Sequence, residues 1–192
     1  MANVEVDLRG MRRLRRALRS GRARKIIRDE VGRQIKLATM QLRRNVVRYI
    51  ETQRHGVPNS PLTVLAKGSS KPLVDRGDLR QGIVTDFYAL PSSLVGVVGV
   101  KRSRKTKDGK KLVNVALALH NGAVVEVTPA VRAAVFAAIR ERTGRRVQFS
   151  GRGGSRRWRI KPRPFIKIPY DEFEPMAIRR IALGVKRAME SL

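Results

Sequence analysis

Basic side chains crowd one short segment of this sequence, and their type and spacing point to the binding of anionic groups. Like charges packed this densely repel one another unless water solvates them or phosphates or carboxylates neutralise them. The segment therefore predicts a solvated loop, a contact with an acidic protein surface, or a contact with nucleic acid. Its seven basic residues are Lys101, Arg102, Arg104, Lys105, Lys107, Lys110 and Lys111.

A second basic region is an arm rich in glycine and arginine at residues 144–155, which we expect to be flexible. Arg152 in this arm, and Arg156 and Arg157 directly after it, join the first segment as candidate contacts with acidic partners. Aromatic residues are not interleaved with the charges of the first segment, so stacking on bases is not supported. Any contact with DNA is therefore expected to involve the phosphate backbone and to be independent of base sequence.

Groups that could catalyse a reaction are scarce. His55 and His120 are the only histidines, cysteine is absent, and no HExxH motif, paired-carboxylate site or Ser/His/Asp arrangement is present. Residues 151–154 read Gly-Arg-Gly-Gly, but they lack the G-x-x-x-x-G-K-[ST] pattern of a phosphate-binding loop. We therefore expect a protein that is not an enzyme and needs no cofactor or metal. His120 is expected to be a packed structural residue.

The overall charge is strongly positive, with 43 Lys and Arg against 15 Asp and Glu and a formal net charge of +28 in 192 residues. Hydrophobic residues make up 42% of the chain, which is enough for a core, so a folded protein with basic surfaces is predicted. The length predicts a single domain over residues 1–192. No segment is apolar enough to span a membrane, and we expect neither a membrane partner nor a signal peptide.

A long helix is predicted over Arg22–Gln53, because apolar residues recur there at steps of three and four. A helix of this length spans about 45 Å, which exceeds the radius expected of so small a domain. We therefore expect its outer part, which includes Leu42 and Val46, to pack on a neighbouring copy of the chain. A short strand over Val4–Arg9 and a short helix over Met11–Ser20 are predicted to precede it.

The pattern changes to a period of two after residue 82, which predicts strands. A hairpin tip is predicted over Lys101–Lys111, with Asp108 and Gly109 in its turn. The fold class is therefore α+β: an antiparallel sheet of about four strands, with a long N-terminal helix, a short middle helix and a C-terminal helix. The predicted strands are Ile83–Leu90, Leu94–Val100, Leu112–Leu119, Ala123–Val127 and a short one at Trp158–Ile160, and the further helices are Asp75–Gly82, Pro129–Thr143 and Asp171–Leu192.

Two short motifs also have roles that the residues themselves suggest. Asp75 is placed to cap a short helical turn, and Gly77 relieves crowding where a loop enters it. Leu79 is expected to anchor that turn to the sheet. Further on, Pro164 holds an extended segment that places Phe165 in the core. All of these roles are structural.

The order of these motifs resembles a known family. The segments are P-L-V-D-R-G-D-L-R-Q-G-I at residues 72–83, A-L-H-N-G at 118–122 and I-K-P-R-P-F at 160–165, before a C-terminal helix with an acidic start. They are similar to segments of the virion morphogenesis (tail completion) family of tailed bacteriophages, which is related to the neck proteins between head and tail. The matching residues are Asp75, Gly77, Leu79, His120, Gly122, Arg163, Pro164 and Phe165.

The resemblance implies a structural virion protein at the joint between head and tail. Such a protein forms a ring, a hexamer by family analogy, that completes the tail and attaches it to the head. Its implied partners are head-connector, tail-terminator or tail-tube proteins, and its implied location is the virion neck after assembly in the host cytoplasm. The alternative is a sequence-independent DNA-binding protein, such as a nucleoid or packaging factor, and non-specific DNA contact is compatible with both.

Overall fold

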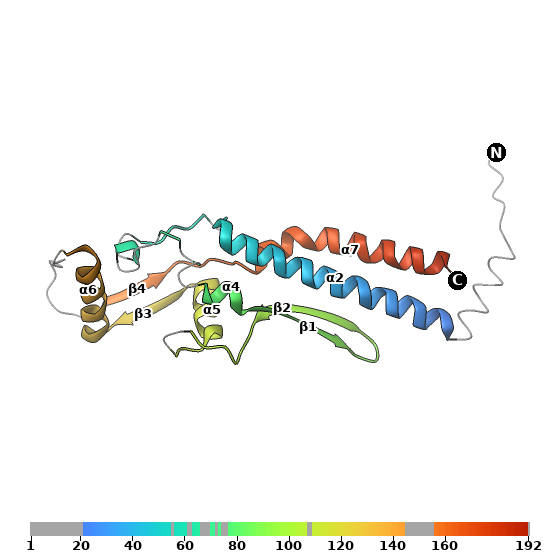
Figure 1. The fold of residues 1–192 in the computed structure, drawn as a ribbon, viewed down its shortest axis with the longest axis horizontal. Helices are drawn as coiled ribbons and strands as arrows, with labels where there is room; N and C mark the ends of the chain where they lie inside the picture. The colour runs from blue at the N-terminus through green and yellow to red at the C-terminus, as the bar shows by residue number, and fades with distance from the viewer. Residues whose placement is uncertain are drawn as a thin grey trace. The chain divides into compact units, whose positions relative to one another are not determined.

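The computed structural model describes residues 21–54, 56–60, 63–65, 70, 71, 73, 77–106, 109–144 and 156–191. The predicted strand Val4–Arg9 and helix Met11–Ser20 lie outside these residues. The described helices are α2 (Arg22–Thr52), α4 (Asp78–Gly82), α5 (Leu112–Asn121), α6 (Pro129–Thr143) and α7 (Lys167–Glu190), and the strands are β1 (Ile83–Ala89), β2 (Leu94–Val100), β3 (Ala123–Val127) and β4 (Arg156–Ile160) (Figure 1).

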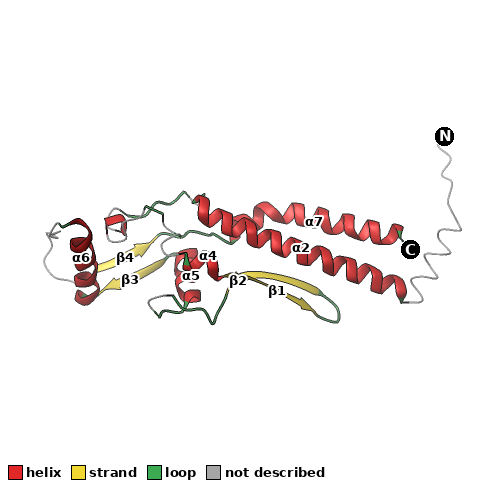
Figure 2. Ribbon diagram, in the orientation of Figure 1, coloured by secondary structure: helices red, strands yellow, loops and turns green. Residues whose placement is uncertain are grey.

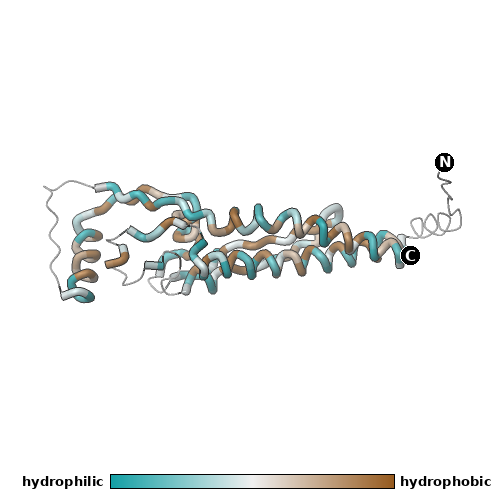
Figure 3. The backbone as a smooth tube through the Cα atoms, turned by 90° about the horizontal axis from the view of Figure 1, so that it is seen from above, coloured by the Kyte–Doolittle hydropathy of each residue, from teal (hydrophilic) through white to brown (hydrophobic). Residues whose placement is uncertain are grey.

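The mixed helix and sheet class is confirmed, with long helices near both ends of the described chain. The four strands form two antiparallel two-stranded sheets, β1–β2 and β3–β4 (Figure 2). The predicted bounds of β2, β3 and α6 agree with the structure residue for residue. Hydrophobic and hydrophilic residues alternate along the long helices, as the periodicity requires (Figure 3).

One predicted strand is wrong, because residues 112–119 form most of helix α5. The sequence L-V-N-V-A-L-A-L alternates like a strand, but it also places Leu112, Val115, Ala116 and Leu119 at helical steps. The structure buries Leu112 and Ala116, which lie one helical turn apart. Alanine and leucine also favour a helix. Packing and propensity together therefore select the helical period over the period of two.

The described chain divides into two compact units. The first unit contains residues 21–42, which include the first part of α2, the hairpin at 85–97, and residues 171–191, which include most of α7. The second unit contains the described parts of 43–84 and 98–170, which include α4, α5, β3, β4 and α6.

In the first unit, α2 and α7 run antiparallel and are joined by a polar contact. The buried Gln34 on α2 donates from Nε2 to Glu30 Oε1 at 2.7 Å and accepts a hydrogen bond from Arg180 Nε of α7 at 3.2 Å. Arg33 binds both carboxylate oxygens of Glu30 at 2.9 and 3.0 Å. The bonds from Gln34 and Arg33 lower the pKa of Glu30. Gly184 permits this approach, because a Cβ there would lie 2.6 Å from Gln34 Cγ.

The hairpin of the first unit packs one face on α2. A Cβ added to Gly96 would lie only 1.9 Å from Thr39 Oγ1, so β2 meets the helix through bare backbone. Lys36 lies 4.8 Å above the ring of Phe87 on β1, a cation–π distance. Leu94 and Phe87 both lie within van der Waals distance of a Cβ built at Gly32. Side chains alternate along a strand, so the residues between these inner ones point to the opposite face.

The second unit is built around Phe165, Ile50, Ile83 and Leu112, all fully buried. A Cβ on Gly82 would lie 2.2 Å from Leu112 Cδ2, so the end of α4 packs directly on α5. In this unit β3 and β4 pair in the register Val125 with Trp158. Thr128 caps the start of α6, because its hydroxyl accepts a hydrogen bond from the backbone N–H of Val131. Val46, expected to face a neighbouring copy, is instead 0% exposed. That expectation is corrected, because the residue is covered within its own chain.

The approach of β2 to α2 generates a stability prediction. Gly96→Ala forces its Cβ into Thr39, and overpacking of this kind costs about 1–3 kcal/mol. Gly99→Ala on the same strand is the matched control, because nothing lies within 4 Å of the position that its Cβ would take. Urea denaturation of both variants is the measurement. Adding Thr39→Ala to Gly96→Ala should recover part of the loss in a double-mutant cycle. Equal stability of the two glycine variants would contradict the close approach.

Candidate functional site

The basic segment at 101–111 folds back on itself where it is described. Lys105 and Lys111 form an antiparallel bridge, and the backbone N–H of Thr106 donates to the carbonyl of Lys110 at 2.8 Å. Gly109, at φ 78, closes the turn in a conformation that suits glycine. The predicted hairpin tip is therefore present, although it leads from β2 into helix α5 and not into another strand.

The basic residues of this tip divide by what they contact. Arg104 is held in place, because its guanidinium donates to the backbone oxygen of Gln81 at 3.0 Å and to its side-chain oxygen at 2.6 Å. It braces the tip against α4 and is not a free contact residue. Lys107 lies outside the described residues. The exposed members are Lys101, Arg102, Lys105, Lys110 and Lys111.

Of the other three predicted contact residues, only the side chain of Arg157 is described. Arg152, with most of the arm at 144–155, lies outside the described residues. The backbone of Arg156 begins β4, and the exposed Arg157 lies 3.9 Å from Glu126 on the paired strand. An exposed pair at this distance contributes about 0–1 kcal/mol, so Arg157 remains available to an external partner.

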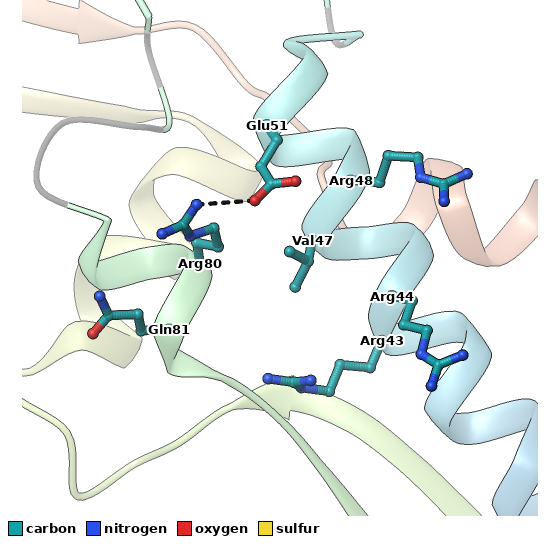
Figure 4. Close-up of a pocket in the computed structure, with 7 residues that line it drawn as sticks. All are labelled: Arg43, Arg44, Val47, Arg48, Glu51, Arg80 and Gln81. Atoms are coloured by element: carbon teal, nitrogen blue, oxygen red, sulfur yellow. Dashed lines mark hydrogen bonds and ion pairs between the residues drawn. The ribbon is translucent and has the colours of Figure 1, made fainter.

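A basic groove that the sequence did not single out lies in the second unit, between α2 and α4 (Figure 4). It has a volume of about 410 Å³, and its lining residues include four arginines and one glutamate. An excess of arginine of this kind favours an anionic ligand. The lining residues are Arg43, Arg44, Val47, Arg48, Glu51, Arg80 and Gln81.

Two of the arginines are anchored within the groove. Arg43 donates from Nε to the backbone oxygen of Ile83 at 2.8 Å, and its two terminal nitrogens have no partner among the described residues. Arg80 on α4 bonds to Glu51 on α2 at 3.0 Å, the interaction drawn in Figure 4. Gln81 is in turn fixed by Arg104. The floor of the groove is therefore held by hydrogen bonds from both sides.

The other two arginines are not engaged. Within the described residues, no hydrogen bond or ion pair holds the side chain of Arg44 or Arg48, and both are exposed. They lie four residues apart, or about 6 Å along the helix axis. In Figure 4 their heads point away from Arg80, on the other side of α2. The set therefore presents positive charge in the groove through Arg43 and Arg80, and on the far side of α2, the outer rim of the groove, through Arg44 and Arg48.

No local sequence pattern marks this groove, and the reason is physical. Arg43, Arg44 and Arg48 are visible as basic residues off the apolar stripe of the long helix, a signal shared by many solvated helices. Only the packing of α4 against α2 adds Arg80 and Gln81 and makes a concave surface. That packing depends on long-range contacts that no local pattern reports.

The motif residues form a structural cluster. His120 lies edge-on to Phe165, with ring centroids 5.3 Å apart. The buried Arg163 donates to the backbone oxygens of Val57 and Pro58 at 3.3 and 3.1 Å, and burial lowers its pKa. Its backbone N–H donates to the Leu119 carbonyl at 2.8 Å. These contacts explain why the second and third motifs occur together.

The glycines and leucine of the motifs behave as their types suggest. Gly122 has φ 78, and a Cβ there would lie 2.8 Å from the Ile160 oxygen. Gly77 precedes α4 with φ 76, and Leu79 in that helix is buried. Pro164 is half-buried beside Phe165. Asp75 lies outside the described residues, so its predicted capping role stays a prediction.

His120 has an unusual environment. Its Nδ1 is buried and has no hydrogen-bond partner among the described residues. Burial disfavours the charged imidazolium and lowers the pKa of His120. The structural role predicted for this histidine fits its contact with Phe165. Its chemistry is that of a neutral, packed ring.

This environment predicts a dependence of stability on pH. The folded chain holds His120 neutral more strongly than the unfolded chain does, so the stability it contributes is present above the ordinary pKa of 6.5 and is lost as pH falls below it. His120→Phe should remove this part of the acid destabilisation while keeping an aromatic contact with Phe165. Urea denaturation from about pH 7.5 to about pH 5 is the measurement. An unchanged pH slope in the variant would contradict the assignment.

Within the described residues, no group of three or more His, Cys, Asp or Glu side chains is placed to hold a metal ion. None of the described helices combines the length and apolar character needed to cross a membrane. Comparison with protein-family models, with curated proteins and with solved structures finds no match to this chain.

Proposed function

We propose that the chain is a structural protein of the joint between head and tail in a tailed bacteriophage, and that its copies associate into a ring. The motif order described above suggests the family, and the function of such a protein is assembly. The observation that carries the proposal is an apolar sheet face that no part of the described chain covers. It lies on the β1–β2 hairpin, on the side away from α2.

The exposed face of the hairpin carries apolar side chains, one carboxylate, Asp86, which accepts a hydrogen bond from the Tyr88 hydroxyl, and no positive charge. Tyr88, Val95 and Val97 are 50%, 38% and 42% exposed. Residues 83–100 contain no lysine or arginine, in a chain with 43 of them. Copies that carry a net charge of +28 repel one another, so they associate best through surfaces that lack that charge. The hairpin provides such a surface.

The edges of the same hairpin support association. Among the described strands, β1 and β2 pair only with each other, which leaves an outer edge on each. The sequence of β2 is L-V-G-V-V-G-V, without a charge or proline to block the addition of another strand. A hairpin of two strands is marginally stable alone and gains from additional strands. A neighbouring copy is the occupant that the proposal assigns to this edge.

Helix α7 carries further uncovered apolar surface. Phe173, Gly184 and Ala188 are buried, whereas large apolar residues beside them are not. Met176 and Leu183 lie on one side of this buried stripe and Ile178 and Met189 on the other, so apolar positions extend over more than half of the helix circumference. This is wider than one helix contact requires. The exposed fractions of Met176, Ile178, Leu183 and Met189 are 56%, 61%, 55% and 45%.

The first test of the proposal is the oligomeric state. Val95→Asp with Val97→Asp places two carboxylates on the outer face, where each would lose solvation in an interface. We expect the variant to elute as a folded monomer in light-scattering chromatography, and the unaltered chain to form rings visible by negative stain. Ser92→Asp with Ser93→Asp adds the same charge at the hairpin turn and should still assemble. Monomers from both variants, or rings from both, would refute an interface on this face.

A second test addresses attachment to the head. Lys105 and Lys110 are exposed on the hairpin tip, so Lys105→Glu with Lys110→Glu should leave the thermal unfolding temperature unchanged. If the tip holds acidic neighbouring proteins, the reversal replaces attraction with repulsion. Complementation of a phage that lacks this protein should then yield separate heads and tails. A normal yield of joined particles would show that the tip is only solvated.

A further inference from the structure

We propose that the groove between α2 and α4 binds the phosphodiester backbone of nucleic acid without reading its sequence. The inference does not rest on ring formation, because every residue that it uses belongs to the second unit of a single chain. It also places the contact away from the exposed lysines of the hairpin tip, which the sequence had favoured.

The groove has the donors that phosphates require. Guanidinium groups offer paired N–H donors that match two oxygens of a phosphate. Arg43 uses only its Nε on the Ile83 carbonyl, so its terminal nitrogens remain for a ligand. That bond fixes the Arg43 side chain without neutralising its charge, because a carbonyl oxygen carries no net charge. An arginine positioned in this way loses little conformational entropy on binding.

The rim extends the contact along a strand. Arg44 and Arg48 are separated by about 6 Å along the α2 axis, which is close to the rise of two nucleotides, about 6.8 Å, on one strand of B-DNA. Both side chains are exposed and unengaged within the described residues. Their heads lie on the side of α2 away from Arg80, so a duplex that lies across α2 contacts them on that side of the helix and Arg43 on the groove side (Figure 4).

Phosphate fits better than the carboxylates of an acidic protein for two reasons. Glu51 already supplies one carboxylate to Arg80, and Arg43 in the groove and Arg44 and Arg48 on its rim have no carboxylate partner among the described residues. The net charge of +28 attracts a polyanion over its whole length, and each neutralised phosphate adds the entropy of released counterions. No aromatic residue lines the groove, so bases have no stacking surface there.

The test compares two variants that remove the same charge. Arg44→Gln with Arg48→Gln alters the rim of the groove, and Arg24→Gln with Arg179→Gln removes two exposed arginines of the first unit that have no partner among the described residues. The probe is a short fluorescein-labelled duplex of mixed sequence, followed by anisotropy over a range of salt concentrations. Circular dichroism melting confirms that both variants remain folded.

We expect the rim variant to bind about tenfold more weakly at about 0.1 M salt, with a salt slope shallower by about one to two units, because each lost phosphate contact removes about 0.9 from the slope. The control should lose less than about threefold. Arg44→Lys with Arg48→Lys, which keeps the charge, should bind close to the unaltered chain. Duplexes of different sequence should bind equally.

Three outcomes would overturn the inference. Equal losses in the rim variant and the control would show that net charge alone attracts the duplex. Displacement of the duplex by poly-glutamate at equal charge concentration would show that the groove takes acidic polypeptide as readily. A strong preference for one duplex sequence would require base contacts that the groove does not offer.

Discussion

The scarcity of acidic residues is the constraint on which the rest of this structure depends. With 43 basic and 15 acidic side chains, most cations cannot be paired within the chain. The structure uses backbone oxygens in their place: Arg28 donates to the carbonyls of Leu90 and Pro91, and Arg43 to that of Ile83. Arginine suits this role because its planar fork stays charged and donates several hydrogen bonds at once. These bonds fasten turns and strand starts and leave the positive charge in place.

Two of the paired carboxylates lie where helices meet. Glu30 organises the polar contact between α2 and α7, and Glu51 joins α2 to α4 through Arg80. A part-buried polar contact such as that of Gln34 with Arg180 favours one register of two helices, because a shift leaves the buried amide oxygen of Gln34 unsatisfied. Glycine allows another close contact in this unit, because the bare backbone at Gly96 lies against Thr39. The hairpin at residues 83–100, which has no lysine or arginine, therefore adds no positive charge to the surface beside α2.

Local periodicity predicted most of the elements, because the residues of β2, β3 and α6 follow a single period bounded by clear signals such as the Thr128 cap. It failed at residues 112–119, where strand and helix periods fit equally and tertiary packing decided. The single sheet became two, since pairing between distant strands is not encoded locally. Val46 was assigned to an interface because its stripe was long, but the length of a stripe does not reveal which side is already covered.

Local sequence patterns likewise predict one of the two basic surfaces and not the other. The hairpin tip is contiguous in sequence and was visible there, whereas the groove combines residues of α2 and α4 that lie about thirty positions apart. Arg104 connects them, because it belongs to the tip and holds Gln81, which lines the groove. A substitution at Arg104 therefore disturbs the groove as well as the tip. Loss of anion binding in such a variant cannot be assigned to the tip, whereas Lys105 and Arg44, whose side chains have no partner among the described residues, separate the two surfaces.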